Sequence, residues 1–532
     1  MQATLSFHDL TFTWPDGDTP LSGLTFDLGP GRYGLVGSNG AGKSTLLRVA
    51  AGRLTATSGR VTTTGRIGYL PQDAVTGDTV AAALGVAERL TALEAIEAGS
   101  TDPDVFDTVG DDWDVADRSV AVLSRLGLAH LDLDRTVDGL SGGELTMLAL
   151  GGLLLDRPDV LLLDEPSNNL DRLARRRLWN VIDGFGGLLV LASHDRELLG
   201  HVDQIGEVRD GTVRWFGGGF EAYAAAIATE QEAAERRARD AAADLRKQRR
   251  EWADTQVKLA RRARYGKKMT KQKREPKIIM NARKRAAQES AGRLKDQHQQ
   301  DVRQARERLD AARAEVRDDR EIRLDLPKTA VPANRVVLTM EQVRPRHVDL
   351  VVDLELRGPE RLGLSGPNGS GKSTVLRTAL GLLEPRSGDV RLRVPARYLP
   401  QRLDGVLDDD RSVIENVRAA APSRSETELR SVLGRMLFRG RRADQRLGSL
   451  SGGERLRATL ACALHADVAP QLLALDEPTN HLDLPSIRHL VEALGSFEGA
   501  LLVISHDERF LDDLELDRAV DVRDLGGTDL AG

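Results

Sequence analysis

The sequence predicts an α/β protein in which two similar domains are joined by a long α-helical hairpin. Three observations support this fold class. Strand-like apolar runs lead into two glycine-rich loops of one pattern, six short sequence blocks occur in the same order in both halves, and a long charged segment separates the halves. We expect the first domain to span residues 1–220, the hairpin residues 221–325 and the second domain residues 326–532.

Composition narrows the protein class. A chain of 532 residues with 40% hydrophobic content can bury sizeable cores, and an aromatic content of 4% suits helix-rich and α/β domains. The N-terminus lacks a basic region followed by an apolar run, and no apolar stretch reaches 18 residues, so neither secretion nor membrane spanning is predicted. Cys462 is the single cysteine, which excludes internal disulfides and cysteine-ligated zinc or iron–sulfur centres. We expect a reducing cytoplasm.

The segment between the halves has the pattern of two long helices. Residues 221–264 contain no Pro or Gly, and Leu245, Trp252 and Leu259 recur every seven residues. A second arm, from about residue 281 to 317, carries Leu294, Val302, Leu309 and Val316. These arms would extend roughly 55–65 Å and join near residues 265–276 as an antiparallel hairpin with a thin apolar seam.

Basic and acidic residues are distributed unevenly along this hairpin. Residues 261–285 hold a dozen Lys and Arg with Glu275 as the sole acid, although the whole chain has a net charge of −6. A solvated spacer is the plain alternative, but a spacer does not require mixed signs on the arms and one sign at the tip. We therefore expect the tip to meet nucleic-acid phosphate. The candidate RNA contacts are Lys267, Lys268, Lys271, Lys273, Arg274 and Lys277.

Each half contains a phosphate-binding loop of the pattern G-x-x-x-x-G-K-S between a strand and a helix. The glycines let backbone amides close on phosphates, and the helix directs its positive end toward them. Lys43 and Lys372 would reach the β and γ oxygens, and Ser44 and Ser373 would ligate Mg²⁺. The loop residues expected to bind ATP are Gly37, Asn39, Gly40, Gly42, Lys43, Ser44 and Thr45 in the first copy, and Gly366, Asn368, Gly369, Gly371, Lys372, Ser373 and Thr374 in the second.

The remaining blocks of the repeat also carry chemistry. An apolar strand ending in Asp-Glu places two carboxylates beside each phosphate loop, so Asp164 and Asp476 would organise Mg²⁺. Glu165 and Glu477 would orient or deprotonate the attacking water. A histidine follows 29 residues after each glutamate, and we expect it to bond the γ-phosphate and hold the water. The two histidines are His194 and His506.

The repeated blocks, in chain order, are GxNGxGKST, YLPQ, LSGGE, LDEP, NxLD and SHD. With these motifs the chain resembles the ATP-binding cassette superfamily. Two cassettes in one polypeptide with a charged helical linker resemble the ABC-F family, whose members act on ribosomes. The resemblance covers nearly the whole chain and implies a P-loop ATPase fold for each half.

The resemblance also implies how the motifs assemble. Gln72 and Gln401, in YLPQ, would bind nucleotide and Mg²⁺. Each LSGGE segment would face the ATP of the other cassette, so the cassettes pair within one chain, as a monomer. One site would join Lys43, Glu165 and His194 with the second signature, and the other would join Lys372, Glu477 and His506 with the first. The signature residues are Ser141, Gly142, Gly143, Ser451, Gly452 and Gly453.

Two features depart from a symmetric pair. Trp14 stands where cassettes commonly stack an aromatic ring on adenine, with a core tryptophan as the alternative, whereas residues 343–351 offer only Arg346 and His347. The first cassette is also 19 residues longer between its phosphate-loop lysine and signature serine, within an acidic stretch around residues 90–115. Some ABC-F proteins carry a ribosome-contacting arm there; we expect a reduced arm or none. Both glutamates are present, so two competent ATPase sites are expected.

We therefore expect a twin-cassette ATPase that binds the ribosome, including its rRNA and tRNA, in the ATP-closed state. The resemblance leaves two outcomes open, protection of ribosomes against antibiotics and relief of stalled ribosomes, and we favour the first. A nucleotide-binding subunit of a membrane transporter is the alternative from another class. A basic hairpin would have no role in such a subunit.

Overall fold

The computed structural model describes residues 3–72, 77–168, 170–271, 277–316, 326–480 and 482–526. The chain divides into two compact units. One unit holds both α/β halves, and the other holds the helical hairpin of residues 223–320. Within the described residues, no helix is both long enough and apolar enough to cross a membrane.

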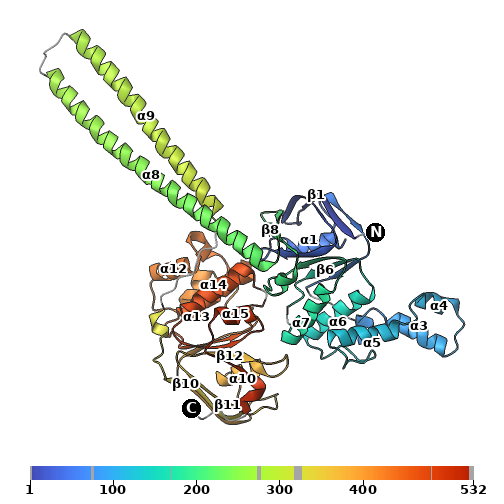
Figure 1. The fold of residues 1–532 in the computed structure, drawn as a ribbon. Helices are drawn as coiled ribbons and strands as arrows, with labels where there is room; N and C mark the ends of the chain where they lie inside the picture. Colours follow the sequence, from blue (N-terminus) through green and yellow to red (C-terminus); the bar gives the residue numbers. More distant parts are fainter. Residues whose placement is uncertain are drawn as a thin grey trace. The chain divides into compact units, whose positions relative to one another are not determined.

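The first half is built on a mainly parallel six-stranded sheet (Figure 1). A separate antiparallel sheet of three strands packs against it through helix α1 (Lys43–Ala50) in one hydrophobic core. The parallel sheet has the order β5 (Ile67–Leu70), β6 (Val160–Asp164), β7 (Leu188–Ala192), β3 (Gly31–Val36), β8 (Gln204–Arg209) and β9 (Thr212–Gly217), and the antiparallel sheet has the order β2 (Leu21–Leu28), β1 (Thr4–Phe12) and β4 (Ser58–Thr64).

The second half repeats this architecture with a five-stranded parallel sheet and another three-stranded antiparallel sheet. Helix α10 (Lys372–Ala379) takes the place of α1. The parallel order is β14 (Ala396–Leu399), β15 (Leu472–Asp476), β16 (Ala500–Ile504), β12 (Arg361–Ser365) and β17 (Arg518–Asp521), and the antiparallel order is β11 (Val352–Arg357), β10 (Val336–Arg344) and β13 (Ser387–Leu392).

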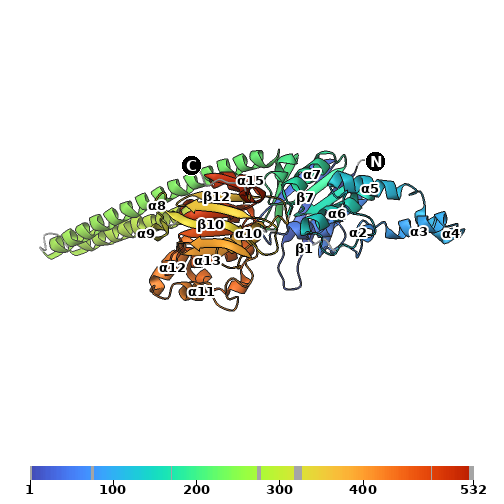
Figure 2. The same ribbon diagram turned by 90° about the horizontal axis from the view of Figure 1, so that it is seen from below.

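The strands of the two parallel sheets are continuous apolar runs because helices cover both faces of such sheets. All five residues of β6, β7, β15 and β16 are buried. In the second half, α11 to α13 gather on one side (Figure 2). The other helices of the two halves are α2 (Val80–Ala83), α3 (Ala87–Glu97), α4 (Pro103–Val109), α5 (Val115–Leu126), α6 (Gly142–Leu155), α7 (Arg172–Asp183), α11 (Val413–Ala420), α12 (Glu426–Arg435), α13 (Gly452–Leu464), α14 (Leu484–Gly495) and α15 (Glu508–Asp513). Short 3₁₀ turns occur at Leu198–His201, Pro327–Thr329, Gly440–Asp444, Leu447–Ser449 and Val522–Gly526.

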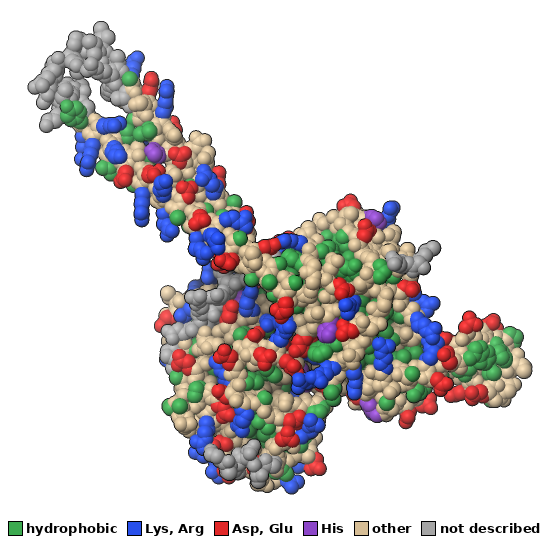
Figure 3. Space-filling view, viewed as in Figure 1, with side chains coloured by type: hydrophobic (Ala, Val, Ile, Leu, Met, Phe, Trp, Pro, Cys, Tyr) green, Lys and Arg blue, Asp and Glu red, His purple; other side chains and the backbone are tan. Residues whose placement is uncertain are grey.

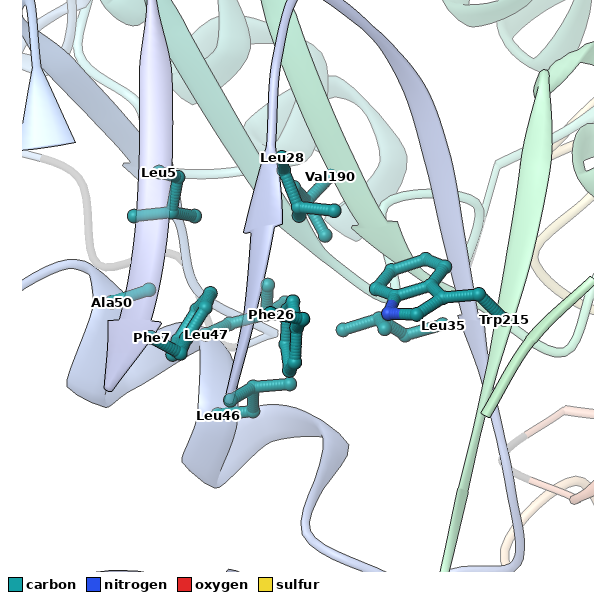
Figure 4. Close-up of a pocket in the computed structure, with 10 residues that line it drawn as sticks. All are labelled: Leu5, Phe7, Phe26, Leu28, Leu35, Leu46, Leu47, Ala50, Val190 and Trp215. Atoms are coloured by element: carbon teal, nitrogen blue, oxygen red, sulfur yellow. The ribbon is translucent and has the colours of Figure 1, made fainter. Parts of the chain in front are cut away.

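One apolar cavity lies in the core of the first half, between the antiparallel sheet, α1 and the parallel sheet (Figure 4). Every lining side chain is hydrophobic, and the Trp215 ring packs edge-on to Phe26 at a centroid distance of 5.5 Å. The lining contains no charged group, and its one side-chain polar atom is the indole nitrogen of Trp215, so we assign the cavity to core packing.

The hairpin unit consists of α8 (Phe220–Lys271) and α9 (Lys277–Glu315), so the predicted helical pair is confirmed. Helix α8 is longer than expected: 52 residues correspond to about 78 Å at roughly 1.5 Å per residue. The expected turn began at residue 265, but α8 continues to Lys271 because no helix-breaking proline occurs before Pro276.

The two helices are held together by a thin seam of apolar and small side chains. Leu245, Ala305 and Leu309 form its buried centre. The Trp252 and His298 rings lie 5.9 Å apart, and Arg237 Nη1 pairs with Glu315 Oε2 at 2.8 Å. Not every heptad residue is covered, since Leu294 is 38% exposed. Figure 3 shows both signs of charge along the hairpin's described part.

The basic residues proposed to contact RNA lie largely outside the described parts. Lys273 and Arg274 are among residues 272–276, which the structure leaves out. The backbone of Lys267, Lys268, Lys271 and Lys277 belongs to α8 and α9, but their side chains are not described. Their expected role stays a prediction.

The 19-residue excess of the first half contains helices α3 and α4. The insert is therefore a small helical arm, which agrees with the expectation of a reduced arm and not with that of no arm. Its surface is acidic and partly apolar in Figure 3. Phe106 and Trp113 are 38% and 53% exposed, and Asp112 bonds Arg89 and Arg118 at the base of the arm.

Candidate functional site: two phosphate-loop sites

The sheet topology brings the separate motifs of each half to one edge. In the first half, Leu35 of β3 and Asp164 of β6 both pair with Ala192 of β7. In the second half, Leu364 and Asp476 both pair with Ile504. The carboxyl ends of parallel strands meet at one edge of the sheet, which is where ligands bind in such folds. The phosphate loop, the Asp-Glu pair and the histidine are therefore neighbours in both halves.

Each phosphate loop ends in a helix whose first amides have no side-chain cap. Gly42 and Gly371 are the N-caps of α1 and α10, with φ of 105° and 92°. A Cβ atom at Gly371 would lie 2.6 Å from Val348, so glycine is required by space as well as by conformation. Uncapped amides at a helix N-terminus are ready donors to an anion.

The loop lysines are buried against their own loops. Lys43 Nζ donates to the carbonyl oxygens of Gly37 at 2.8 Å and Ser38 at 3.3 Å. Lys372 Nζ donates to Gly366 O at 2.8 Å and Pro367 O at 2.9 Å. Burial lowers the pKa of both lysines, and nearby carboxylates oppose that shift. Each ammonium group is thus held in the loop that phosphates would enter.

A serine, a carboxylate and a tyrosine form a chain of oxygens in each half. Ser44 Oγ donates to Asp164 Oδ1 at 2.8 Å, and Tyr69 OH donates to Asp164 Oδ2 at 3.4 Å. In the second half Ser373 Oγ lies 3.0 Å from Asp476 Oδ1, and Tyr398 OH lies 2.9 Å from Asp476 Oδ2. Hydroxyl and carboxylate oxygens are the ligands that Mg²⁺ prefers, so this donor set fits the ion.

The two tyrosines were missed from the sequence as site residues. Each occurs three positions before the glutamine of its YLPQ block. It lies in a short strand that pairs with the strand ending in the aspartate, and this pairing would have been the signal. Gln72 and Gln401 themselves follow β5 and β14 and are exposed.

The glutamates that follow the two Asp residues adopt an unusual backbone conformation. Glu165 and Glu477 have φ of 49° and 48°, which costs a non-glycine residue of the order of 1 kcal/mol. Their amides donate to Ala192 O at 2.9 Å and Ile504 O at 2.8 Å, so the turn is fixed by the neighbouring strand. Both copies keep this strained geometry, which directs the carboxylates toward the histidines.

Glutamate and histidine face each other in both sites. His194 Nε2 lies 3.5 Å from Glu165 Oε1, and His506 Nε2 lies 3.4 Å from Glu477 Oε1. Burial raises the pKa of Glu165 to about 8 and that of Glu477 to about 7. Burial lowers the pKa of His194 to about 3 and that of His506 to about 4, so both imidazoles are neutral at pH 7.

The sites contain polar atoms that lack partners. Among the described side chains, both ring nitrogens of His194 and Glu477 Oε1 are buried without a hydrogen bond. Buried polar atoms are rarely left unpaired unless a ligand or water joins them. A phosphate oxygen and a water molecule would satisfy these groups, which fits the expected binding of ATP.

Signature serines are tied to their own helices. Ser141 caps α6 and Ser451 caps α13, each in a capping box with the glutamate three residues later. Ser141 Oγ donates to Glu144 Oε2 at 2.8 Å, and Ser451 Oγ donates to Glu454 Oε2 at 3.0 Å. A hydroxyl used in this way can still accept a bond, but it must rotate to donate one to phosphate.

The two halves contact each other through the aspartates that end the NxLD blocks. Asn39 N donates to Asp483 Oδ2 at 3.0 Å, and Asn368 N donates to Asp171 Oδ2 at 3.4 Å. A Cβ atom built on Gly453 would lie 3.6 Å from Asp483 Oδ1. The second signature segment and the first phosphate loop therefore share a neighbour. Both aspartates belong to the repeated NxLD blocks, but their contacts with the opposite phosphate loop were not predicted from the sequence.

Trp14 is half-buried at the end of the antiparallel sheet. Its ring packs edge-on to Phe12 with centroids 4.8 Å apart, and its amide donates to Asp18 O at 2.7 Å. It lies against the first hydrophobic core, so both expected roles, adenine contact and core packing, stay open to experiment.

Comparison with known proteins identifies relatives of both halves. The ABC transporter family matches residues 21–168 and again residues 351–480. The chain is 32% identical to "Tylosin resistance ATP-binding protein TlrC" of Streptomyces fradiae, over 95% of this chain and 95% of that protein. It is 31% identical to "Probable ATP-binding protein YheS" of Escherichia coli K12, over 94% of this chain and 77% of the relative.

Another relative is "ABC transporter F family member 5" of Arabidopsis thaliana, 30% identical over 97% of this chain and 74% of the relative. Among solved structures, the archaeal ribosome recycling factor aABCE1, in complex with a ribosomal stalk protein, superimposes with a TM-score of 0.56. That match has 20% identity and covers 96% of this chain and 87% of the other. At this identity it supports the tandem-cassette fold alone.

Proposed function

The chain belongs to the F family of ATP-binding-cassette proteins, and on this premise we propose that it is a Mg²⁺-dependent ATPase that binds the ribosome when ATP closes its cassettes. The observation that carries the enzymatic part is the duplicated Glu–His pair beside each phosphate loop, at 3.5 and 3.4 Å. The partner follows from the family and from the basic segment at the hairpin tip.

Each glutamate suits the role of general base. Burial holds the pKa of Glu165 and Glu477 near the working pH, where a base is most effective. The neutral imidazoles of His194 and His506 would orient the attacking water and bond a γ-phosphate oxygen. Lys43 and Lys372 would neutralise charge on the β and γ oxygens. Ser44 and Asp164 in the first site, and Ser373 and Asp476 in the second, would hold Mg²⁺, which would supply positive charge to the phosphate groups.

For the biological outcome we propose protection of the ribosome against an antibiotic, in the cytoplasm. The similarity to the tylosin resistance protein along 95% of both chains supports this choice over general relief of stalled ribosomes. The hairpin tip would act near the tRNA and the peptidyl-transferase region. Its basic side chains suit rRNA phosphates, while the acidic α3–α4 arm does not.

The experiment that tests this function is sedimentation of the Glu165→Gln, Glu477→Gln protein with ribosomes on sucrose gradients, with and without ATP. This variant should bind ATP without turnover and comigrate with ribosomes only when ATP is present. Residual hydrolysis at the wild-type rate would remove the glutamates from the mechanism. Failure to comigrate at low salt would favour a membrane partner, which fractionation of cell membranes would detect.

Two further experiments test the role of the hairpin tip and the biological outcome. Charge reversal at the tip (Lys267, Lys268, Lys271, Lys273 and Arg274 to Glu) should weaken ribosome binding and leave basal ATPase activity intact, whereas unchanged binding would make the hairpin a spacer. Translation challenged with a panel of large-subunit antibiotics should separate drug protection from stall relief. Rescue of stalled, drug-free translation alone would support the translation-factor alternative.

A further inference from the structure

A short segment of the second cassette, between α12 and the second signature, is strongly basic. Residues 435–446 read RMLFRGRRADQR and contain five arginines, no lysine and one acid. Five arginines against one aspartate give this arginine-rich segment a charge of +4, in a chain whose net charge is −6. Its one acid, Asp444, pairs with Arg430 outside the segment at 2.8 Å.

Apolar side chains anchor the arginine-rich segment and leave its arginines at the surface. Four apolar residues in or beside the segment are at most 2% exposed and belong to one hydrophobic core, namely Met436, Phe438, Ala443 and Leu447. The five arginines between these anchors are all exposed: Arg435, Arg439, Arg441, Arg442 and Arg446. The core thus fixes the course of the backbone without using the charge of the guanidinium groups.

Other arginines of this part of the second cassette have acidic partners. Arg411 pairs with Asp408 at 3.0 Å, Arg418 with Glu426 at 3.0 Å and Arg430 with Asp444 at 2.8 Å. Within the arginine-rich segment only Arg442 comes near an acid, with Nη1 4.0 Å from Glu454 Oε1. The other four form no ion pair with an acid in the parts of the chain that the structure describes. Their charges are therefore available to a partner outside the chain.

The first cassette builds the same segment without this charge. Residues 125–136 end five residues before the first signature serine, as residues 435–446 do before the second. Thr136 pairs with Thr79 in an isolated β-bridge, and Arg446 pairs with Ser412 in the same way. Residues 125–136 contain two arginines and two aspartates, so they carry no net charge. The fold of the segment therefore does not require the arginines.

The chemistry of the arginine-rich segment fits phosphate. A guanidinium group is a planar fork of N–H donors that bonds two phosphate oxygens at once, and every cation of the segment is an arginine. Several arginines in one short segment can engage successive phosphates of a nucleic-acid backbone. A membrane surface of anionic lipid fits less well, because peripheral binding also uses exposed apolar side chains. Residues 435–446 contain no exposed large hydrophobic side chain.

We propose that residues 435–446 form an RNA-docking surface on the second cassette, in which Arg439, Arg441 and Arg446 bind the phosphate backbone. This surface belongs to the unit that holds both cassettes and is distinct in sequence from the basic tip of the hairpin. The choice of RNA rests on the proposed function, in which the ribosome is the partner. The affinity of the segment for a phosphate backbone does not rest on it.

The test measures the Kd of the full chain for a fluorescent RNA duplex of about 20 base pairs, by anisotropy, between about 50 and 200 mM KCl. The parent protein has a neutral hairpin tip (Lys267, Lys268, Lys271, Lys273 and Arg274 to Gln), so that the tip does not dominate binding. In this parent, Arg439→Gln, Arg441→Gln and Arg446→Gln together should raise Kd about tenfold. The slope of log affinity against log salt concentration should fall in magnitude by about two to three.

Two sets of control variants separate this surface from net charge and from folding. Arg386→Gln, Arg391→Gln and Arg393→Gln remove the same charge at exposed positions in and beside β13 of the same half, and should change Kd less than about twofold. Arg439→Lys, Arg441→Lys and Arg446→Lys keep the charge and should keep the salt dependence, with a Kd at most about threefold higher because the bidentate bonds are lost. The Tm of each variant reports its fold.

Equal losses in the two glutamine triples, or no loss in the first, would overturn the inference. Poly-glutamate and phosphatidylserine vesicles are the comparison probes, and tighter binding of either than of RNA would assign the segment to an acidic protein or a membrane. Sedimentation with ribosomes separates the inference from the proposed function. If the Glu165→Gln, Glu477→Gln protein ignores ribosomes while the segment binds RNA, only the proposed function fails. If it comigrates with ribosomes and the first triple binds RNA like its parent, only the inference fails.

Discussion

The backbone amide of Asn39 donates a hydrogen bond to Asp483 Oδ2 at 3.0 Å, and this contact ties the first phosphate loop to the second cassette. Asp483 Oδ1 simultaneously caps α14 by accepting from Ser486 N at 3.0 Å. The same carboxylate thus caps the N-terminus of α14 and accepts a hydrogen bond from the Asn39 amide, which belongs to the phosphate loop. Its charge also acts on Lys43 and His194 of the first site.

Asp483→Asn should strengthen nucleotide binding at the first site. Asparagine still caps a helix, so α14 should keep its start, while a negative charge beside incoming phosphates is removed. We expect about a threefold to tenfold lower Kd for ATP, measured by titration in the Glu165→Gln, Glu477→Gln background. Asp171→Asn is the matched variant for the second site, where the contact is longer at 3.4 Å. A higher Kd for ATP in Asp483→Asn than in the parent protein would contradict this account.

Trp14→Ala should raise KM for ATP if the ring stacks on adenine. The ring is half-buried and packs on Phe12, so the variant must be compared with Trp14→Phe, which keeps an aromatic face. We expect about a tenfold higher KM for the alanine variant and less than threefold for phenylalanine. An unchanged KM together with a lower Tm would assign Trp14 to the core.

His465 should make the second cassette less stable in mild acid. Burial lowers its pKa from 6.5 to about 4, and Arg424 and Arg435 add to that shift. The unfolded chain therefore binds the proton more readily, and the stabilising contribution, complete above pH 6.5, is lost as pH falls toward 4. At pH 5 the loss is about 2 kcal/mol.

The measurement is the Tm of wild type and His465→Gln between pH 7.5 and 5. Other buried groups also titrate in this range, so the difference between the two proteins carries the information. The wild type should lose more stability than the variant as pH falls. Parallel curves would show that His465 is protonated in the folded protein as easily as in the unfolded chain.

Ala305→Glu should separate the helices of the hairpin. Ala305 is 1% exposed at the centre of a seam that also contains Leu245 and Leu309, and a longer charged side chain cannot be buried there without a partner. We expect a loss of several kcal/mol in hairpin stability, seen as rapid hydrogen exchange along α8 and α9. Ala311→Glu, on an exposed position of the same helix, is the control and should exchange like wild type.

The motifs could be read from the sequence because each one is local. A strand followed by G-x-x-x-x-G-K-S fixes a phosphate loop within nine residues, and its duplication at residues 37–45 and 366–374 predicted two such domains. The helical hairpin was equally local, since α8 lacks an interior proline. The turn was expected from residue 265, but α8 continues through Gly266 to Lys271, because a glycine within a long helix costs only about 1 kcal/mol.

Tyr69, Tyr398 and Asp483 could not be assigned roles in the same way. Their partners lie 95, 78 and 444 residues away, and only strand order and the packing of one cassette on the other bring them together. The sequence by itself determined the two phosphate loops, the Asp-Glu pairs, the histidines and the helical hairpin, because short-range backbone geometry and apolar periodicity encode them. Tertiary structure alone decided that Asp483 of one half accepts a hydrogen bond from the Asn39 amide of the other, since that contact depends on how the two cassettes pack and not on any short stretch of sequence.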